Sequence, residues 1–389
     1  MSSHIPLSCA DITDSEIYAA TDALRGERLA LGSWTARFEK SVAQHVGSNF
    51  GIATNSAYSA MYITLESLGI GAGDEVITPA FTFPWGAACI LQLGATPVFA
   101  DCDPRSLNMD AKDVVAKLTG ETKAIIASHT YGNPTGVEAL SKVAQEQEIP
   151  LIEDAGQAIG SKLHGRKVGT FGRVAIFAFN STAQLTSIDG GVIVTDDDAL
   201  ARNCSLLRNH GLTSDPVITT DELHRVRTDE LMLTLGHGFK ISEVHAAVGA
   251  VQMDRFEEIM QRRTVVAQWY TQRLGGVADI MCPTIDGGVE ISWDGFVIRL
   301  NDRFSRDDRD EVIRGLHRHD IGAADYFQSV STLPPILDRC ETVHPCPVAE
   351  SISQRMIALP FYTLMTRREV DIVCQTLELM ITRSTLVDT

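Results

Sequence analysis

Between residues 50 and 195, short apolar runs alternate with longer amphipathic segments, and this rhythm constrains the fold more than any other feature. The apolar runs at 51–54, 123–128 and 150–154 are short, as buried strands are, and segments of helical character lie between them. Strands that alternate with helices of this length are typical of βαβ units, in which helices cover a mainly parallel sheet. We therefore predict an α/β fold whose large, mainly parallel sheet is covered by helices on both faces.

The pattern changes near residue 256, and this change divides the chain into two expected domains. A long amphipathic helix is expected at 243–260, where the change occurs. Beyond it, one strand and two helices indicate an α+β layer; they are expected at 289–300, 309–321 and 368–381. We place a large domain at 1–255 and a smaller C-terminal α+β domain at 256–389. The N-terminal helix expected at 14–25 is a candidate to pack on the small domain.

Charge and composition exclude several classes of protein. The formal net charge is −17, and a field of this sign repels polyphosphate backbones, so we expect no nucleic-acid partner. The 8 cysteines include no CxxC pair, which favours buried thiols in a reducing compartment. The N-terminus lacks the pattern of a signal peptide, and no apolar run is long enough to cross a membrane. We therefore expect a cytoplasmic protein with no membrane partner.

Three segments are candidates for a ligand site because ligands bind at the carboxyl ends of parallel strands. Asp154 follows an apolar run, so its carboxylate could pair with a protonated ring nitrogen or a metal, act as a base, or cap a helix. Residues 179–191 combine hydroxyls with a glycine pair, which could cradle a phosphate or form an ordinary polar turn. Residues 55–59 lie where a helix begins, and there the serines could cap the helix or help to bind an anion.

Common fingerprints of nucleotide, hydrolase and metal sites are absent from the sequence. Neither GxGxxG after a first strand, nor GxxxxGK[ST], nor GxSxG occurs. His129 and His210 lack the spacing of metal ligands, so we interpret both as hydrogen-bonded structural histidines. We expect no metal centre.

Seven segments, spread over nearly the whole chain, carry a resemblance to a known family. They are GIGAGDEVITPAFTF (69–83), GATPVFADCDPRSLNMD (94–110), TKAIIASHTYGNPTG (122–136), IPLIEDAGQAIGS (149–161), GGVIVTDDDALARNCSLLRNHG (190–211), ISEVHAAVGAVQMDRF (241–256) and CPVAESISQRMIALPFY (346–362). In this order they resemble the sugar aminotransferases of the DegT/DnrJ/EryC1/StrS family, which are fold-type-I pyridoxal-phosphate proteins. The resemblance implies that the large domain binds pyridoxal 5′-phosphate or pyridoxamine 5′-phosphate.

The resemblance implies how the ring of this cofactor would be held. Asp154 would pair with the pyridine nitrogen, because a carboxylate keeps that nitrogen protonated and the ring can then withdraw electrons. Gln157 would contact the ring hydroxyl or one face of the ring, and Phe83 would stack on the other face. Trp85 would lie nearby, toward the substrate.

Two phosphate-binding segments are also implied by the resemblance. Ala57, Tyr58 and Ser59 lie where the family places a helix N-terminus under the phosphate. Asn180 and Ser181 would lie on the second phosphate loop. The family usually has Gly-Thr where this chain has Ala57 and Tyr58.

A further segment would reach the site from a neighbouring subunit. The family's sequence there is close to GxNYR, and here it reads GHGFK at 236–240. Gly238 stands where an asparagine would contact the phosphate, and Lys240 stands where the family has arginine. We interpret Lys240 as a phosphate-side or surface charge. Together with Trp85 and His129, Lys240 is also a candidate substrate contact.

The largest departure from the family is Ala183, at the position of the lysine that forms the Schiff base. Alanine has no nucleophile and cannot move a proton. An engineered Lys→Ala change would suit the ordinary residues around it, whereas a natural lysine-free protein would suit the other departures. In either case we predict a cofactor bound non-covalently, or as an adduct with substrate, and slow or absent turnover.

The resemblance implies a homodimeric aminotransferase that acts on a nucleotide-linked keto sugar or a keto-cyclitol, with glutamate or glutamine as amino donor. The resemblance implies that Asp154 would assist electron withdrawal by the cofactor ring. The family's lysine, replaced here by Ala183, would be the base. Two alternatives remain open. One is a lysine-free pyridoxamine-phosphate-dependent dehydratase, and the other is a non-catalytic homologue that binds a ligand or a partner.

Overall fold

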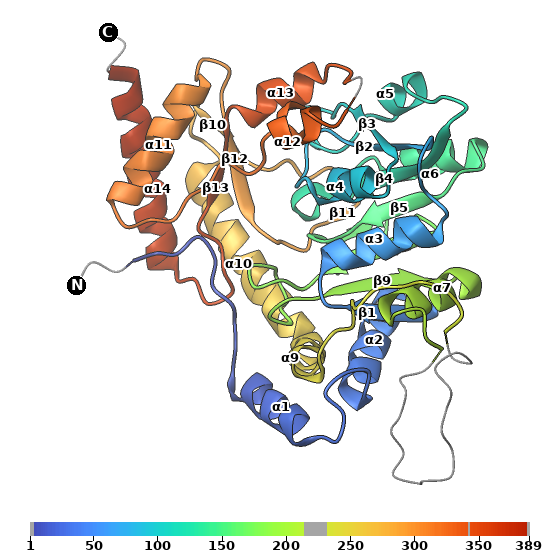
Figure 1. Cartoon of the computed structure of the whole chain (residues 1–389). Helices are drawn as coiled ribbons and strands as arrows, with labels where there is room; N and C mark the ends of the chain where they lie inside the picture. Colours follow the sequence, from blue (N-terminus) through green and yellow to red (C-terminus); the bar gives the residue numbers. More distant parts are fainter. Residues whose placement is uncertain (1–3, 214–231, 341–342, 387–389) are drawn as a thin grey trace.

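In the computed structural model, residues 4–213, 232–340 and 343–386 are described. The strands of its large sheet are β1 (Phe50–Thr54), β2 (Glu75–Pro79), β3 (Thr96–Ala100), β4 (Thr122–Ser128), β5 (Leu151–Asp154), β8 (Val174–Ala178) and β9 (Gly191–Thr195). They lie in the order β1-β9-β8-β5-β4-β2-β3 (Figure 1). The neighbours from β8 to β3 are parallel, and only β9 pairs antiparallel, with β1 and β8. The prediction of a large, mainly parallel sheet is confirmed.

Helices cover both faces of this sheet. They are α2 (Ser33–Val46), α3 (Ala57–Ser67), α4 (Trp85–Gln92), α5 (Ala111–Ala116), α6 (Val137–Glu146), α7 (Asp198–Arg208) and α9 (Glu243–Asp254), with a 3-10 turn at Thr130–Gly132. Successive side chains of a strand point to opposite faces, and in β9 Val192 and Val194 pack with α2 and α9 while Ile193 packs with α3, α4 and α7. Alternate strand residues therefore build two separate apolar layers, one on each side of the sheet.

The smaller, C-terminal unit is an antiparallel sheet backed by long helices. Its elements are α10 (Phe256–Leu274), β10 (Ile280–Met281), β12 (Phe296–Leu300), α11 (Arg306–Arg318), a 3-10 turn (Val330–Thr332), α12 (Pro334–Leu337), α13 (Pro347–Ser353), β13 (Met356–Leu359) and α14 (Arg367–Leu386). The sheet order is β10-β12-β13. Tyr270, Phe296, Leu316 and Leu377 lie in one buried cluster that joins this sheet to the helices. In Figure 1, α11 and α14 lie on the side of this unit away from the large sheet.

Two predicted elements are interrupted in the structure. The helix expected at 243–260 is two helices, α9 and α10, separated at Arg255. At the break Arg255 has φ −94° and ψ 8°, and its guanidinium binds Asp11 and Glu16. The strand expected at 289–300 is also divided: β11 (Val289–Glu290) pairs with β6 (Lys162–Leu163), which pairs with β7 (Arg166–Lys167), whereas β12 belongs to the small sheet.

The N-terminal segment contacts both units. The helix α1 (Asp14–Arg25) lies where the sequence predicts it, and its Ala19 and Ala23 pack on Ala247 and Val251 of α9. Before α1, Ile5 forms a bridge with Ile321 and joins the core of the small unit. In the structure this helix, the candidate to pack on the small domain, packs on α9, and the residues before it reach the small unit.

No helix in the described ranges combines the length and the apolarity needed to span a bilayer. The 8 cysteines, all within those ranges, are free thiols. The surface loop expected at 212–230 lies outside the described residues from 214 onward.

Candidate functional site

A cavity of about 420 Å³ opens where the parallel strands end. Ser128, Asp154 and Ala178, the last residues of β4, β5 and β8, line it. The small unit closes it with residues 294–297 and 358–359. The cavity therefore lies at the edge of the sheet where α/β proteins bind ligands, between the two units of the chain.

Asp154 is a buried hydrogen-bond acceptor at the centre of this site. The indole Nε1–H of Trp85 donates to Oδ2 (2.8 Å), the hydroxyl of Ser128 donates to the same oxygen (3.1 Å), and the Gly156 N–H donates to Oδ1 (3.3 Å). Burial raises the pKa of the Asp154 carboxyl, although these donors oppose the shift. No helix begins in the residues that follow, so Asp154 does not serve as a helix cap.

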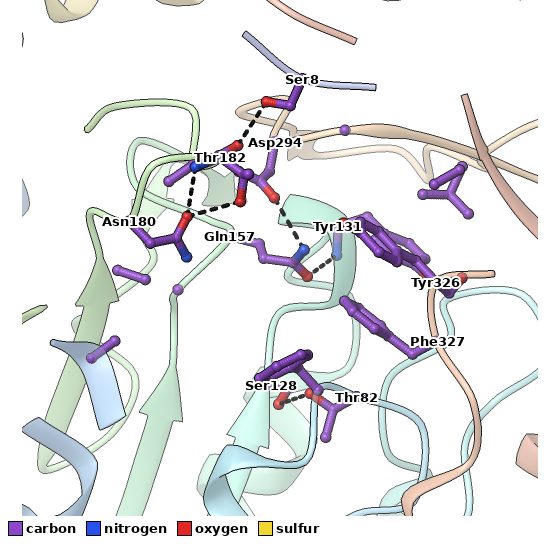
Figure 2. A pocket seen from close by; sticks show the side chains of 18 of the residues that line it. Ser8, Thr82, Ser128, Tyr131, Gln157, Asn180, Thr182, Asp294, Tyr326 and Phe327 are labelled. Carbon is purple, nitrogen blue, oxygen red and sulfur yellow. Dashed lines mark hydrogen bonds between the residues drawn. The ribbon is translucent and has the colours of Figure 1, made fainter. Parts of the chain in front are cut away.

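Gln157 joins the two units across the cavity. Its Oε1 accepts the Tyr131 N–H (3.1 Å), and its Nε2 donates to Oδ2 of Asp294 (3.0 Å), as Figure 2 shows. The other oxygen of Asp294 accepts the Gln184 N–H (3.1 Å). Burial also raises the pKa of Asp294. Both ends of the Gln157 amide therefore have protein partners.

The loop after β8 carries Ala183 into the cavity wall. Asn180 Oδ1 accepts hydrogen bonds from the Thr182 N–H (3.0 Å) and hydroxyl (2.9 Å), and Ser8 Oγ donates to the Thr182 carbonyl (3.3 Å; Figure 2). Asn180 and Thr182 also line the cavity, whereas Ser181 does not. These hydrogen bonds therefore fix the backbone of the loop. At position 183 the loop presents only a methyl group to the cavity.

The N-terminus of α3 forms another part of the wall. Ser56 caps the helix by accepting the Ser59 N–H (3.1 Å), and Ser56, Ala57 and Tyr58 line the cavity while Ser59 is buried beneath them. The first N–H groups of a helix have no partner within it and favour an anion. Gly191 permits this arrangement, because a Cβ there would be 2.5 Å from Ala57 Cα.

Apart from His129 and the tyrosines, the ionisable side chains on the cavity wall that the structure describes are all carboxylic acids. They are Asp154, Asp189 and Asp294, and the lining residues that the structure describes include no lysine or arginine. Aromatic side chains supply much of the remaining surface, among them the exposed ring of Phe83. For an anionic group, the favourable potential from the described part of this chain comes from the N-terminus of α3.

His129 is buried beside Asp154 and is held by an acid. Its Nε2 lies 2.8 Å from Oε2 of Glu153, which also accepts the Gly169 N–H (2.9 Å). Oε1 of Glu153 accepts the N–H groups of Phe171 (2.6 Å) and Gly172 (2.7 Å). This network ties β4 and β5 to the segment before β8.

The segment expected to serve a neighbouring subunit lies outside the cavity of its own chain. Gly238 packs against the ring of His210, with a Cβ position only 2.9 Å from Cε1. Lys240 forms a bridge with Thr54 at the edge of β1. Neither residue lines the cavity. Their predicted contribution to a second subunit stays a prediction.

Several lining residues were missed by the sequence analysis. Ser128 follows the run 123–127, so the rule that selected Asp154 could have selected it. Asp294, Tyr326 and Phe327 carry no such signal, because they reach the site only through the packing of the small unit on the large one. Among the described residues, no group of three or more His, Cys, Asp or Glu side chains could hold a metal ion.

Comparisons with known proteins agree with this geometry. The profile of the DegT/DnrJ/EryC1/StrS aminotransferase family matches residues 10–378. The chain belongs to this family. Its fold matches the aminotransferase TlmJ from Streptoalloteichus hindustanus with a TM-score of 0.89 and 26% identity, over 98% of this chain and 100% of the other. It also matches DesV from S. venezuelae, solved with a ketimine intermediate, with a TM-score of 0.84 and 27% identity, over 94% of each chain.

A third relative shares the fold and carries the cofactor. The sugar aminotransferase Spr1654 from Streptococcus pneumoniae, described as putative and solved in its PMP form, matches with a TM-score of 0.91 and 24% identity, over 98% of this chain and 100% of the other. The family depends on pyridoxal phosphate, and its members are enzymes that transfer amino groups.

The residues present fit a pyridoxal-type cofactor at two points. The Asp154 carboxylate and the N-terminus of α3 line the same cavity, as a ring nitrogen and a phosphate require. Two other features differ. Ala183 offers no amine for a covalent tether, and the indole N–H of Trp85 already donates to the Asp154 carboxylate. The cavity therefore suits a group held by non-covalent contacts.

Proposed function

We propose that this chain is a lysine-free member of the sugar aminotransferases, which holds pyridoxal or pyridoxamine phosphate non-covalently in the cavity. Its second ligand would be a nucleotide-linked keto sugar or a keto-cyclitol. We propose that, without a lysine at position 183, it turns over slowly or not at all with glutamate or glutamine as donor.

One observation carries this proposal: Asp154 and Ala183 lie on the wall of the same cavity, in the fold of an aminotransferase family. When bound, the cofactor would supply an electron-withdrawing ring and an amine carrier. Asp154 would hold the ring nitrogen protonated, and α3 would orient the phosphate through its free N–H groups. The methyl group of Ala183 can neither accept nor deliver a proton, so the chain itself offers no base at that position.

The other departures from the family's sequence support the interpretation of Ala183 as a natural feature of this chain. Ala57 and Tyr58 stand where the family usually has Gly-Thr, and Gly238 stands where it has asparagine. A single engineered change would not produce these further differences. An encoding gene with a lysine codon at 183 would contradict this interpretation.

We also propose a homodimer, because the cavity wall described here offers no cationic side chain for an anionic nucleotide. A second copy would bring residues 236–240 to the site, with Lys240 among them. Light scattering of the purified chain should give a mass near twice 42.3 kDa. A mass of one chain at micromolar concentration would contradict the dimer.

The test of the proposed function is titration of the purified chain with pyridoxamine phosphate and, separately, pyridoxal phosphate. We expect saturable absorbance changes, complete loss of the vitamer on denaturation, and no protein adduct after borohydride treatment. Incubation with glutamate and the pyridoxal form should convert the vitamer at most once.

Each other outcome identifies an alternative. Rapid multiple turnover would contradict the proposal. Release of water from a deoxy-ketosugar precursor without amino transfer would indicate a dehydratase. Absence of binding with either vitamer would indicate a non-catalytic homologue with a different ligand.

A further inference from the structure

Trp85 occupies an acceptor position on the carboxylate to which a ring nitrogen would donate. It is the first residue of α4, follows Pro84, and lines the cavity. Its Nε1–H donates to Oδ2 of Asp154 at 2.8 Å, the shortest of the three hydrogen bonds to this carboxylate. Ser128 donates to the same oxygen. A carboxylate oxygen has two lone-pair directions, so both acceptor positions of Oδ2 are in use.

Gly156 lies beside the indole and the carboxylate. A Cβ at Gly156 would lie 3.7 Å from Trp85 Cζ2, in contact with the ring, and 3.3 Å from both Ala178 Cβ and Asp154 Oδ1. Larger side chains at 156 would press against the indole or the carboxylate. The position of the ring therefore follows from three sets of contacts: the carboxylate, Gly156 and the packing of α4.

We propose that Trp85 is an internal competitor for the cofactor: its indole N–H takes the place of a pyridinium N–H on Oδ2 of Asp154, and a vitamer reaches this oxygen only when the indole leaves. The inference rests on the proposed function, because it concerns the affinity for the same ligand. It goes beyond that function because it assigns the control of access to Asp154 to Trp85. The family resemblance placed this residue toward the substrate.

The competition has a physical basis in the burial of the site. A buried carboxylate must keep hydrogen-bond donors, since an unpaired buried charge is costly. Trp85 supplies such a donor when the vitamer is absent, and a protonated pyridine would supply a stronger, charge-assisted one. Tenfold in affinity corresponds to about 1.4 kcal/mol, which is close to the strength of one hydrogen bond to a charged group. Removal of the competitor should therefore tighten binding about tenfold or more.

The test compares vitamer affinity among variants of the full-length chain, with pyridoxamine phosphate as the probe and equilibrium dialysis as the readout. Trp85→Ala removes both the donor and the ring, and Trp85→Phe removes the donor while retaining a ring that can leave the carboxylate without losing a hydrogen bond. Phe83→Ala is the matched control, because it removes an aromatic ring of the same cavity that does not contact Asp154. Thermal unfolding confirms that each variant is folded.

We expect Trp85→Ala and Trp85→Phe to bind the probe about tenfold more tightly than the unmodified chain, and Phe83→Ala to bind it more weakly. Adding Asp154→Asn to Trp85→Ala should abolish the gain. In the unmodified chain the probe should change tryptophan fluorescence, and this change should shrink in Trp85→Phe.

The outcomes separate this inference from the proposed function. Equal or weaker binding by both Trp85 variants, with measurable binding by the unmodified chain, would overturn the competitor and leave the proposed function standing; Trp85 would then be a platform for the ring. Binding only after Trp85 is replaced would support the competitor and contradict the proposed function of the natural chain. Failure of all variants to bind would overturn both.

Discussion

At the scale of single residues, the proposed function requires a buried acceptor at Asp154 and no amine at position 183. Asp154 is held by three donors at the end of β5, while Ala183 faces the same cavity. Covalent attachment of the cofactor therefore depends on the side chain at position 183, and a single substitution there can test it.

We expect Ala183→Lys to convert non-covalent binding into covalent attachment. A lysine there would place a primary amine on the cavity wall, where it can condense with the aldehyde of pyridoxal phosphate. Borohydride treatment followed by intact-mass measurement should show the reduced adduct in Ala183→Lys. Ala183→Met, which adds a flexible side chain without an amine, is the control and should show none. An adduct of equal yield in the unmodified chain would mean that another lysine serves the site.

At the scale of secondary-structure elements, one buried acid joins two helices that are distant in sequence. The N-cap residue of α2 is Gly32, which has no side chain to cap the helix. Glu243, at the start of α9, accepts the N–H groups of Gly32 (2.9 Å), Trp34 (2.8 Å) and Thr35 (3.0 Å) instead. Its negative charge is also favourable at the N-terminus of α2. A side chain from another helix thus replaces the local cap.

Glu243→Ala should destabilise the fold by roughly 2–4 kcal/mol, because it leaves these buried donors without a partner. Urea denaturation measures the change in the free energy of unfolding. Glu257→Ala, at an exposed position in the first turn of α10, is the control and should change it by less than about 0.5 kcal/mol. Similar values for the two variants would contradict the capping role.

The elements also show where the sequence pattern is informative and where it is not. Strands such as β4 and β5 are buried on both faces, so short apolar runs predict them without knowledge of their neighbours. At the break between α9 and α10, Arg255 binds Asp11 and Glu16, residues more than 230 positions away. No local periodicity encodes such a partner. The division of 289–300 has the same origin, since its two parts pair with different sheets.

At the scale of the whole molecule, a buried acid links the N-terminal segment to α9 and α10. Glu16 accepts hydrogen bonds from Thr13 N (2.8 Å), Gln252 Nε2 (2.8 Å) and Arg255 Nη1 (2.8 Å). Burial alone would raise the pKa of Glu16, but these hydrogen bonds outweigh burial and lower the pKa from 4.5 to about 2. The ionised form is therefore favoured by folding.

This shift predicts how the stability of the molecule depends on pH. Because the folded-state pKa is the lower one, the stabilisation is fully present above pH 4.5 and is lost as the pH falls toward 2. Over this range the unmodified chain should lose up to about 3 kcal/mol through Glu16 alone. Glu16→Gln should be less stable at pH 7 and show a shallower loss in acid. Parallel curves for the two proteins, measured by denaturation at each pH, would contradict the role of Glu16.

The site as a whole was only partly predictable from sequence. Asp154 could be found because a polar residue at the end of a buried strand marks a ligand edge. Asp294 could not, because it reaches Gln157 only when the small unit packs against the large one. The hydrogen bond from the Trp85 indole to Asp154 could not be predicted either, because a resemblance transfers residue positions without the packing between them.

The central claim is that a vitamin B6 ring binds at Asp154 in a cavity without a covalent tether. The most direct measurement is a crystal structure of the unmodified chain with pyridoxamine phosphate. We predict that the ring nitrogen lies within hydrogen-bond distance of Asp154, that the Trp85 indole has moved away from Oδ2, and that no bond joins the ligand to the protein. An empty cavity at saturating ligand, or a ring bound away from Asp154, would contradict the account.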